Sequence, residues 1–423
     1  MNKKLNKLIE FIFHFLIYLT CIFKLPSFCA YLIKLSILKK KKIKNDLRKK
    51  IIIVLSRSIG NREVEIIRKS AGKKFEFLYL RRSITKTILV YFSNKKKIFF
   101  NYLKPKLKKE DYFKQNKIDR KKHEEFWTEV ILSLKNHFHN KNINFVTFNY
   151  SFYAEAALYA GCKRNNVAVK LWYKEGIKTD LEAEQDAKVS KFNHMFKFFS
   201  KISVYNHLVK KMLIMMDKSN KKKITVNGCP RIYDYINKKK INKKIKNVLF
   251  LSFDSKRGIP KYKKNKHLNW NLTYDKVIKL LNELSNNKKI KIIIKRKNKS
   301  TFKSSLHINK NIKIFENGTA EKFINHADII IGHNSASTIE ALVNGKYVMI
   351  PFFEKKSILK KYLYNFNKDI IYTKETNMKN QILKLVDKRV VFPLNNAKHE
   401  KTISYYLGDT KNITEKYVSF LNS

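Results

Sequence analysis

One segment of the sequence, from Ile329 to Pro351, combines residue types that could hold a phosphorylated ligand. It reads IIIGHNSASTIEALVNGKYVMIP, so an apolar run leads into a small polar turn, then a helix-like stretch and a second apolar run. The first N–H groups of a helix attract anions, and serine hydroxyls add donors suited to a diphosphate. A carboxylate one turn into the helix can accept hydrogen bonds from both hydroxyls of a ribose. The segment therefore predicts a nucleotide site formed by Gly332, His333, Asn334, Ser335, Ser337 and Glu340.

A plainer interpretation of the same segment is an ordinary strand, turn, helix and strand. Ser335 or Asn334 would then cap the helix, because both residue types accept hydrogen bonds from the first N–H groups of a helix. Glu340 would be a solvated surface residue. The residues alone leave both interpretations open.

Short apolar runs alternate with helix-like stretches along most of the chain. In the first half, the predicted strands are Ile51–Ser56, Phe75–Leu80, Asn144–Asn149, Val167–Gly176, Lys201–Asn206 and a run from Ile224. In the second half, they are Val248–Asp254, Lys291–Lys297, Ile312–Phe315, Asp328–Asn334 and Tyr347–Phe352. Runs that are apolar throughout are typical of parallel sheets covered by helices on both faces. The predicted fold class is α/β, with two Rossmann-like domains whose parallel sheets face a cleft.

The length of 423 residues suits two such domains. We expect an apolar and basic helical segment over 1–49, an N-terminal domain over 50–237 and a C-terminal domain over 247–400. A lysine-rich linker or exposed stretch over 238–246 separates the two domains, and C-terminal helices follow over 401–423.

Two motifs resemble those of a known class of enzymes. GHNSASTIEALVNGKYVMIPF resembles the C-terminal donor-site signature of GT-B glycosyltransferases and their relatives, which include nucleotide-sugar 2-epimerases and polyol-phosphate transferases. Upstream, VNGCPRIYDYI resembles the TG-x-P-R-x-D turn that closes the N-terminal domain in several of these families. KLWYKEGIKT and KISVYN resemble segments of bacterial surface-carbohydrate biosynthesis proteins. The resemblance extends over most of residues 50–420 and implies the GT-B architecture.

The resemblance also implies that the C-terminal domain binds a nucleotide-sugar donor and the N-terminal domain an acceptor. Ser335 and Ser337 would hold the diphosphate, and Glu340 the ribose. Lys295 matches a position where these enzymes often place a basic residue against donor phosphates, and a solvated lysine is the plainer interpretation. A cation there would offset charge on the departing nucleotide without a metal. The absence of an Asp-x-Asp pair is consistent with that route, so no metal and no cofactor besides the donor substrate is expected.

An inverting transfer needs a general base near the acceptor hydroxyl. Glu175 is the candidate, because it lies at the carboxyl end of a predicted strand, beside Gly176. Some relatives place a histidine at this turn, where this chain has Lys174 and Glu175. Glu155 and His333 therefore stay as alternatives.

Three more residues follow strand ends and could act near the cleft. Arg57 and Gly60, after the first strand, could bind an anionic acceptor, or form a simple turn with an exposed arginine. Arg231, after the Gly-Cys-Pro turn, is predicted to fix the hinge through hydrogen bonds rather than to touch substrate.

The chain is strongly basic, with Lys+Arg 92 against Asp+Glu 33 and a formal net charge of +59. Such a charge suggests a polyanion partner, either nucleic acid or an anionic membrane. The lysines are spread through almost every segment, which is also what a drift in genome composition would produce. The sequence contains no RNA- or DNA-binding motif, so no specific nucleic-acid partner is expected.

The N-terminal residues 8–37 are apolar but interrupted by Lys24, Pro26 and Lys34. Their longest uncharged run, Phe11 to Phe23, is too short for a spanning helix, and no cleavage site for a signal peptide follows. The basic cluster Lys39–Lys50 is suited to anionic headgroups. Two interpretations remain: a helical hairpin packed on the core, or a monotopic anchor on the cytosolic face of the cell membrane.

The four cysteines, with no CxxC pair, are predicted to be reduced thiols without a metal role. Taken together, the sequence predicts a GT-B transferase, cytoplasmic and peripheral on the inner face of the cell membrane. It would add a sugar or a polyol phosphate to a surface glycan or lipid-linked acceptor. An epimerase on the same fold is the alternative, and a basic nucleic-acid-binding protein is a weaker one.

Overall fold

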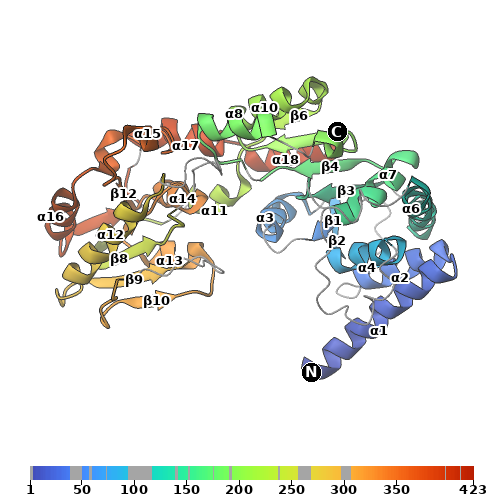
Figure 1. The fold of residues 1–423 in the computed structure, drawn as a ribbon, viewed down its shortest axis with the longest axis horizontal. Coiled ribbons are helices and arrows are strands. Elements are labelled where there is room, and N and C mark those ends of the chain that lie inside the picture. Colours follow the sequence, from blue (N-terminus) through green and yellow to red (C-terminus); the bar gives the residue numbers. More distant parts are fainter. Residues whose placement is uncertain are drawn as a thin grey trace.

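The computed structural model contains two parallel β-sheets, one in each half of the chain (Figure 1). The residues it describes are 3–38, 50–56, 60–72, 74–93, 117–138, 142–150, 153–174, 176–189, 193–236, 239–255, 268–296, 306–395, 397–409 and 411–423. Helices lie on both faces of each sheet, so the predicted α/β class with two Rossmann-like halves is confirmed.

The N-terminal sheet has six parallel strands in the order β2-β1-β3-β4-β5-β6. Their bounds are β1 Lys50–Ser56, β2 Phe75–Arg81, β3 Ile143–Thr147, β4 Val169–Trp172, β5 Lys201–Val204 and β6 Ile224–Val226. The helices of this half are α3 Asn61–Ala71, α4 Arg82–Phe92, α6 Lys117–His137, α7 Ala156–Arg164, α8 Asp180–Val189, α9 Asn193–Phe196, α10 His207–Met216 and α11 Tyr233–Ile236. Ile52 and Val54 of β1 pack in a core shared with α3, whereas Ile51 and Ile53 pack in a second core with α4, α6 and α7.

The C-terminal sheet also has six parallel strands, in the order β10-β9-β8-β11-β12-β13. Their bounds are β8 Asn247–Leu251, β9 Lys291–Lys295, β10 Lys313–Phe315, β11 Ile329–Ile331, β12 Tyr347–Pro351 and β13 Ile371–Tyr372. The helices are α12 Asn271–Leu284, α13 Ala320–His326, α14 Ala336–Val343, α15 Ser357–Lys360 and α16 Glu375–Leu385.

The strand orders place one topological switch point in each sheet. In the C-terminal sheet the order reverses between β8 and β11, and in the N-terminal sheet between β1 and β3. Ligands of open α/β sheets bind beyond the carboxyl ends of the strands at such points. The turn after β11, and the turns after β1 and β3, are therefore the places where the fold itself favours a site.

The segment predicted as a linker or exposed stretch contains a strand. Residues Ile241–Lys244 form β7, which pairs antiparallel with β14, Arg389–Phe392. The carboxylate of Asp328 accepts hydrogen bonds from the N–H groups of Lys246 at 3.0 Å and Asn247 at 2.9 Å. Most of the segment is exposed, although Ile245 is buried, and it belongs to the C-terminal half through a partner strand that is remote in sequence.

The last two helices, α17 Glu400–Leu407 and α18 Ile413–Asn422, carry the chain back to the N-terminal half (Figure 1). The ammonium of Lys170 in β4 donates to the carbonyls of Phe420 at 2.8 Å and Leu421 at 2.9 Å. Gly228 and Gly408 lie against each other with φ of +78° and +79°, and a Cβ on Gly408 would stand 2.0 Å from the carbonyl oxygen of Tyr205. The Gly-Cys-Pro turn is thus the point at which the returning chain crosses the outgoing one.

The N-terminus forms a helical hairpin of α1, Lys3–Ile22, and α2, Pro26–Leu38. α1 packs on α4, and α2 packs on α6 and β2. His14 and Thr87 are in hydrogen-bond contact at 3.1 Å between Nδ1 and Oγ1, and Lys34 donates to the carbonyl of His137 at 2.8 Å. The hairpin therefore packs on the core of the N-terminal half, and the membrane interpretation stays a prediction. Within the described residues, no helix has the length and hydropathy needed to cross a bilayer.

All four cysteines are buried thiols that form no disulfide. In the described part of the chain, no group of three or more His, Cys, Asp or Glu side chains is arranged to hold a metal ion.

Candidate functional site

The turn between β11 and α14 places the predicted donor residues at the switch point of the C-terminal sheet. Gly332 continues from β11 and donates its N–H to the carbonyl of Met349 at 3.1 Å. Ser335 is the N-cap of α14, since its Oγ accepts from the N–H of Thr338 at 3.1 Å. The Thr338 hydroxyl donates to the carbonyl of His333 at 2.8 Å, so the turn is held rigidly against the helix.

Two of the predicted donor residues are buried within the C-terminal half. His333 packs edge to face against Phe253 and Trp270, with ring centroids 4.6 and 4.4 Å apart. The Asn334 amide donates to the carbonyl of Tyr362 and accepts from the N–H of Tyr364 at 3.0 Å. In this conformation these side chains fix the loop after α15 and the core beneath the turn.

The start of α14 is the accessible part of the turn. Ser335, Ala336 and Ser337 are half-buried, whereas the residues on either side of them are buried. The N–H groups of Ala336 and Ser337 lie in the first turn, where a helix offers no carbonyl partner. Together with the Ser337 hydroxyl, they form a donor cluster at the positive end of the helix dipole. This cluster could hold a phosphate or diphosphate.

Glu340 lies one turn further along α14 and faces the hinge between the two halves. One of its carboxylate oxygens lies 3.1 Å from a guanidinium nitrogen of Arg231, and the other accepts from the Tyr235 hydroxyl at 3.4 Å. Arg231 also approaches the Glu63 carboxylate of α3 at 3.1 Å, and the Tyr205 hydroxyl donates to Glu63 at 3.3 Å. Arg231 thus makes the hinge contacts that the sequence predicted for it.

Arg231, Glu63 and Glu340 form a hinge cluster whose charges do not balance, because one guanidinium faces two carboxylates. Glu63 and Glu340 are buried. Burial works against the charge on Arg231, but the nearby carboxylate of Glu340 and, less strongly, that of Glu63 outweigh it and raise the pKa of the guanidinium. The neighbouring carboxylates therefore favour the charged form of Arg231.

A second ion pair joins the two halves beside the first. Arg62 of α3 approaches Glu321 of α13 at 2.7 Å, and its guanidinium lies 5.6 Å from the ring centroid of Tyr235. Glu63, Arg62 and Tyr235 were not predicted as site residues. Their only sequence signal was position, since Glu63 and Arg62 follow the first strand and Tyr235 follows the Gly-Cys-Pro turn.

Lys295 ends β9, at the same edge of the sheet as the turn after β11. Its ammonium donates to the carbonyl of Glu316 at 2.9 Å and to that of Arg296, which ties it to the loop after β10. Burial lowers its pKa. β8 lies between β9 and β11, so the two strands are roughly 10 Å apart, and the side chain is turned toward β10. Its donor role stays a prediction.

The switch point of the N-terminal sheet lies beyond β1 and β3. Gly60 precedes α3 and is buried under the ring of Phe148, which would stand 2.4 Å from a Cβ at this position. The Lys174 ammonium lies 5.8 Å from the centroid of the same ring. This places the turn after β4 beside Gly60. Arg57 and Glu175, predicted as acceptor ligand and general base, lie outside the described residues.

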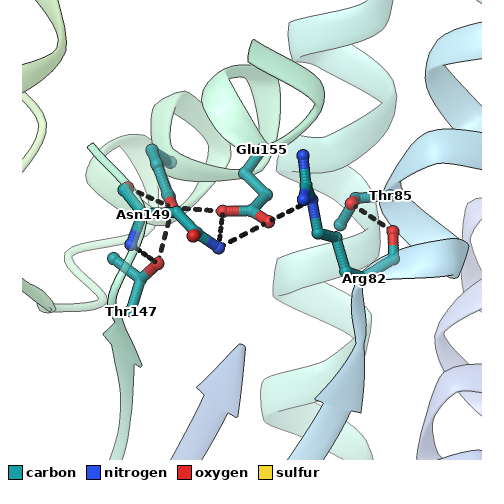
Figure 2. A network of polar contacts seen from close by, with 6 residues as sticks. Arg82, Thr85, Thr147, Asn149 and Glu155 are labelled. Atoms are coloured by element: carbon teal, nitrogen blue, oxygen red, sulfur yellow. Dashed lines mark hydrogen bonds and ion pairs between the residues drawn. The ribbon is translucent and has the colours of Figure 1, made fainter. Parts of the chain in front are cut away.

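Glu155, the alternative base, is the centre of a buried polar network at this switch point (Figure 2). Its carboxylate accepts from the Asn149 amide at 3.1 and 3.2 Å and from the Tyr159 hydroxyl at 2.7 Å. Nε of Arg82 approaches it at 3.6 Å from the start of α4. The carboxylate is thus surrounded by donors on both oxygens and anchors the loop after β3. Arg82, which is partly exposed, is the cation that this network presents at the sheet edge.

Comparison with known proteins gives likeness in structure only. No protein-family model and no curated protein sequence matches the chain. A protein assigned as a UDP-N-acetylglucosamine 2-epimerase from Listeria monocytogenes superimposes with a TM-score of 0.50 at 10% identity, over 89% of this chain and 96% of that one. This chain has a GT-B-like fold.

Two further solved structures match with lower scores. UDP-GlcNAc 2-epimerase from Neisseria meningitidis, bound to UDP-GlcNAc, has a TM-score of 0.48 at 11% identity, over 88% of this chain and 99% of that one. The OtsA apo structure has a TM-score of 0.47 at 6% identity, over 89% and 99%. In the GT-B-like arrangement of this chain, the start of α14 and the hinge cluster are neighbours, because Glu340 belongs to both.

Proposed function

We propose that this protein is a glycosyltransferase that uses a nucleotide-activated sugar, or a related polyol phosphate, to extend a surface glycan or a lipid-linked acceptor. The observation that carries the proposal is the donor cluster at the start of α14, formed by two backbone N–H groups and the Ser337 hydroxyl at a topological switch point. A helix start of this kind binds a diphosphate through charge and hydrogen bonds together.

In the proposed site, Glu340 binds the nucleoside part of the donor. Its contact with the Tyr235 hydroxyl, at 3.4 Å, is longer than an ordinary O–H···O hydrogen bond. This carboxylate oxygen is therefore the one that a ribose hydroxyl can take, while the other stays with Arg231. Ribose binding would then be linked to the hinge between the two halves.

Transfer of a polyol phosphate would join the acceptor oxygen to phosphorus and release a nucleoside monophosphate. Transfer of a sugar forms a bond between the acceptor oxygen and the sugar carbon and breaks the bond from that carbon to the diphosphate. The bonding electrons leave with the diphosphate, and the start of α14 stabilises the developing charge. The acceptor proton passes to a general base, for which Glu175 remains the proposed residue. Arg82 is a proposed cation on the acceptor side, because it presents positive charge beside the Glu155 network.

Epimerisation of a nucleotide sugar is the second candidate, favoured by the likeness to the epimerase from Listeria monocytogenes. That reaction needs side chains that remove and return a proton at the sugar ring. Among the described residues, the carboxylates at the hinge are all paired with a guanidinium: Glu63 and Glu340 with Arg231, and Glu321 with Arg62. Glu155 is held by Asn149 and Tyr159. This favours transfer.

Product analysis separates the two candidates. The purified protein is incubated with UDP-, CDP- and GDP-activated sugars, first alone and then with a membrane-lipid extract as the source of acceptor. A transferase releases nucleotide with extract present and leaves the donor alone unchanged. Conversion of the donor alone into its 2-epimer would replace the proposal with the second candidate, and no reaction of any donor would contradict both.

A further inference from the structure

The N-terminal hairpin buries one face and exposes the other, and the exposed face is apolar. On α1 the residues Leu5, Leu8, Ile12 and Phe15 recur every three or four positions and are all exposed. Ile17, Cys21 and their neighbours on the opposite side lie in the core of the N-terminal half. The helix therefore has a core-facing stripe and a second apolar stripe whose side chains are exposed.

The stripe continues on α2. Phe28, Tyr31 and Leu35 are exposed and follow the same spacing, and the rings of Phe28 and Tyr31 stack with centroids 6.4 Å apart. Between the helices, Phe23 and Leu25 are exposed at the hairpin tip. Groups of exposed large apolar side chains on the surface of a soluble protein mark sites of association.

The charge of the hairpin indicates which kind of surface binds its exposed face. Residues 3–38 contain five lysines and one acidic residue, Glu10, whose carboxylate lies 3.4 Å from Arg81. A second copy of the chain would bring the same positive charge against the first, in a protein with a net charge of +59. An anionic bilayer offers an apolar interior and opposite charge at its surface.

We propose that the exposed face of α1 and α2 is an interfacial docking surface for an anionic lipid bilayer. The apolar stripe enters the boundary between headgroups and acyl chains, and the flanking lysines contact the headgroups. The hairpin lies at the outer end of the N-terminal half, away from the C-terminal half (Figure 1). The inference does not depend on the proposed reaction.

The test is co-sedimentation of the full chain with phosphatidylcholine vesicles that contain phosphatidylglycerol. The hairpin variant is Leu5→Glu/Leu8→Glu/Ile12→Glu, at residues 48–54% exposed. The matched control is Met215→Glu/Leu272→Glu/Leu383→Glu, at helical residues 40–48% exposed elsewhere in the chain. Both variants change the net charge equally, so any difference between them reports the apolar face.

We expect the hairpin variant to bind about tenfold or more weakly than wild type and the control to bind within about twofold of it. Equal loss in both variants would mean that global charge alone draws the protein to vesicles, and would overturn the proposal. Wild-type binding by the hairpin variant would overturn it as well. So would a wild-type oligomer that the hairpin substitutions dissociate without any change in vesicle binding.

Discussion

Arg231 lies between Glu63 and Glu340 and approaches a carboxylate oxygen of each at 3.1 Å. Glu63 belongs to the first helix after β1, and Glu340 to the helix that follows the proposed diphosphate turn. The guanidinium therefore connects the N-terminal switch point with the C-terminal one. A ligand bound to Glu340 would change the balance of charge in this bridge, so the proposed donor site would be linked to the hinge.

Replacing Arg231 by methionine leaves two buried carboxylates facing each other without a cation. Breaking one side of a buried ion pair is strongly destabilising, so we expect a loss of about 3 kcal/mol in the free energy of unfolding. Urea denaturation measures it. The matched control is Arg120→Met, on the exposed face of α6, which should change stability by less than about 0.5 kcal/mol.

The hinge assignment also predicts coupling. Glu63→Gln removes one of the uncompensated charges. In that background, Arg231→Met should therefore lower the free energy of unfolding by at least about 1 kcal/mol less than it does in wild type. Strict additivity of the two substitutions in a double-mutant cycle would contradict the bridge seen in the structure.

Ser335 and Ser337 are predicted to differ although they are two residues apart. Ser335→Ala removes the N-cap of α14 and should lower stability by about 1 kcal/mol. Ser337→Ala should leave stability within about 0.5 kcal/mol, because this hydroxyl is not the cap, and should weaken nucleotide binding. Thermal melts with and without UDP distinguish the two effects. Equal loss of stability in both variants would mean that Ser337 is structural.

His123 predicts sensitivity to acid. It is buried on α6, stacked on Phe92 at 4.8 Å, and burial lowers its pKa from 6.5 to about 3. The unfolded chain therefore takes up a proton before the folded one does, so this contribution to stability is lost as pH falls below 6.5. Between pH 6.5 and 5, wild type should lose about 2 kcal/mol more than His123→Phe. Parallel pH profiles from chemical denaturation would contradict this.

Lys170 predicts that stability depends on pH in the alkaline range. Its pKa is lowered to about 8 from 10.5, mainly by burial and secondarily by Lys50 and Lys201. Between these values the unfolded chain holds more protons, so the stability of wild type relative to Lys170→Met rises with pH, by up to about 3 kcal/mol. Denaturation of both proteins at pH 8 and pH 10.5 measures the difference. A constant difference would show that the ammonium is solvated rather than buried against α18.

Most strands could be predicted because their apolar residues follow one another in the sequence. β8, β11 and β12 are buried along almost their whole length, and their continuous apolar runs mark them without reference to the rest of the chain. β7 was not predictable, since Ile241–Lys244 is polar and exposed and becomes a strand only by pairing with β14. Its sequence carries the composition of a linker.

The site was predictable in position but not in detail. The Gly332–Ser335 turn could be located from the sequence, and so could its two interpretations, of which the N-cap role of Ser335 is seen directly. The engagement of Glu340 by Arg231 could not be derived, because it joins segments that only the complete fold brings together. The burial of Asn334 and His333 depends on the loop after α15 and on the rings of Phe253 and Trp270 in the same way.

The central claim is that the start of α14 binds the diphosphate of a nucleotide sugar. Ser337→Glu tests it most directly, because a carboxylate in the first turn of a helix is favourable to the helix but occupies and repels an anion site. Thr376→Glu, in the exposed first turn of α16, is the matched control with the same change in charge.

The measurement is calorimetric titration of UDP, CDP and GDP, and of their sugars, into wild type and both variants at physiological salt. The account predicts that one base is preferred, that Ser337→Glu weakens its binding by at least about 1.4 kcal/mol, or tenfold, and that Thr376→Glu binds as wild type does. Weak binding of every nucleotide alike, reduced equally by both variants, would contradict it and leave the turn as an ordinary helix cap in a very basic protein.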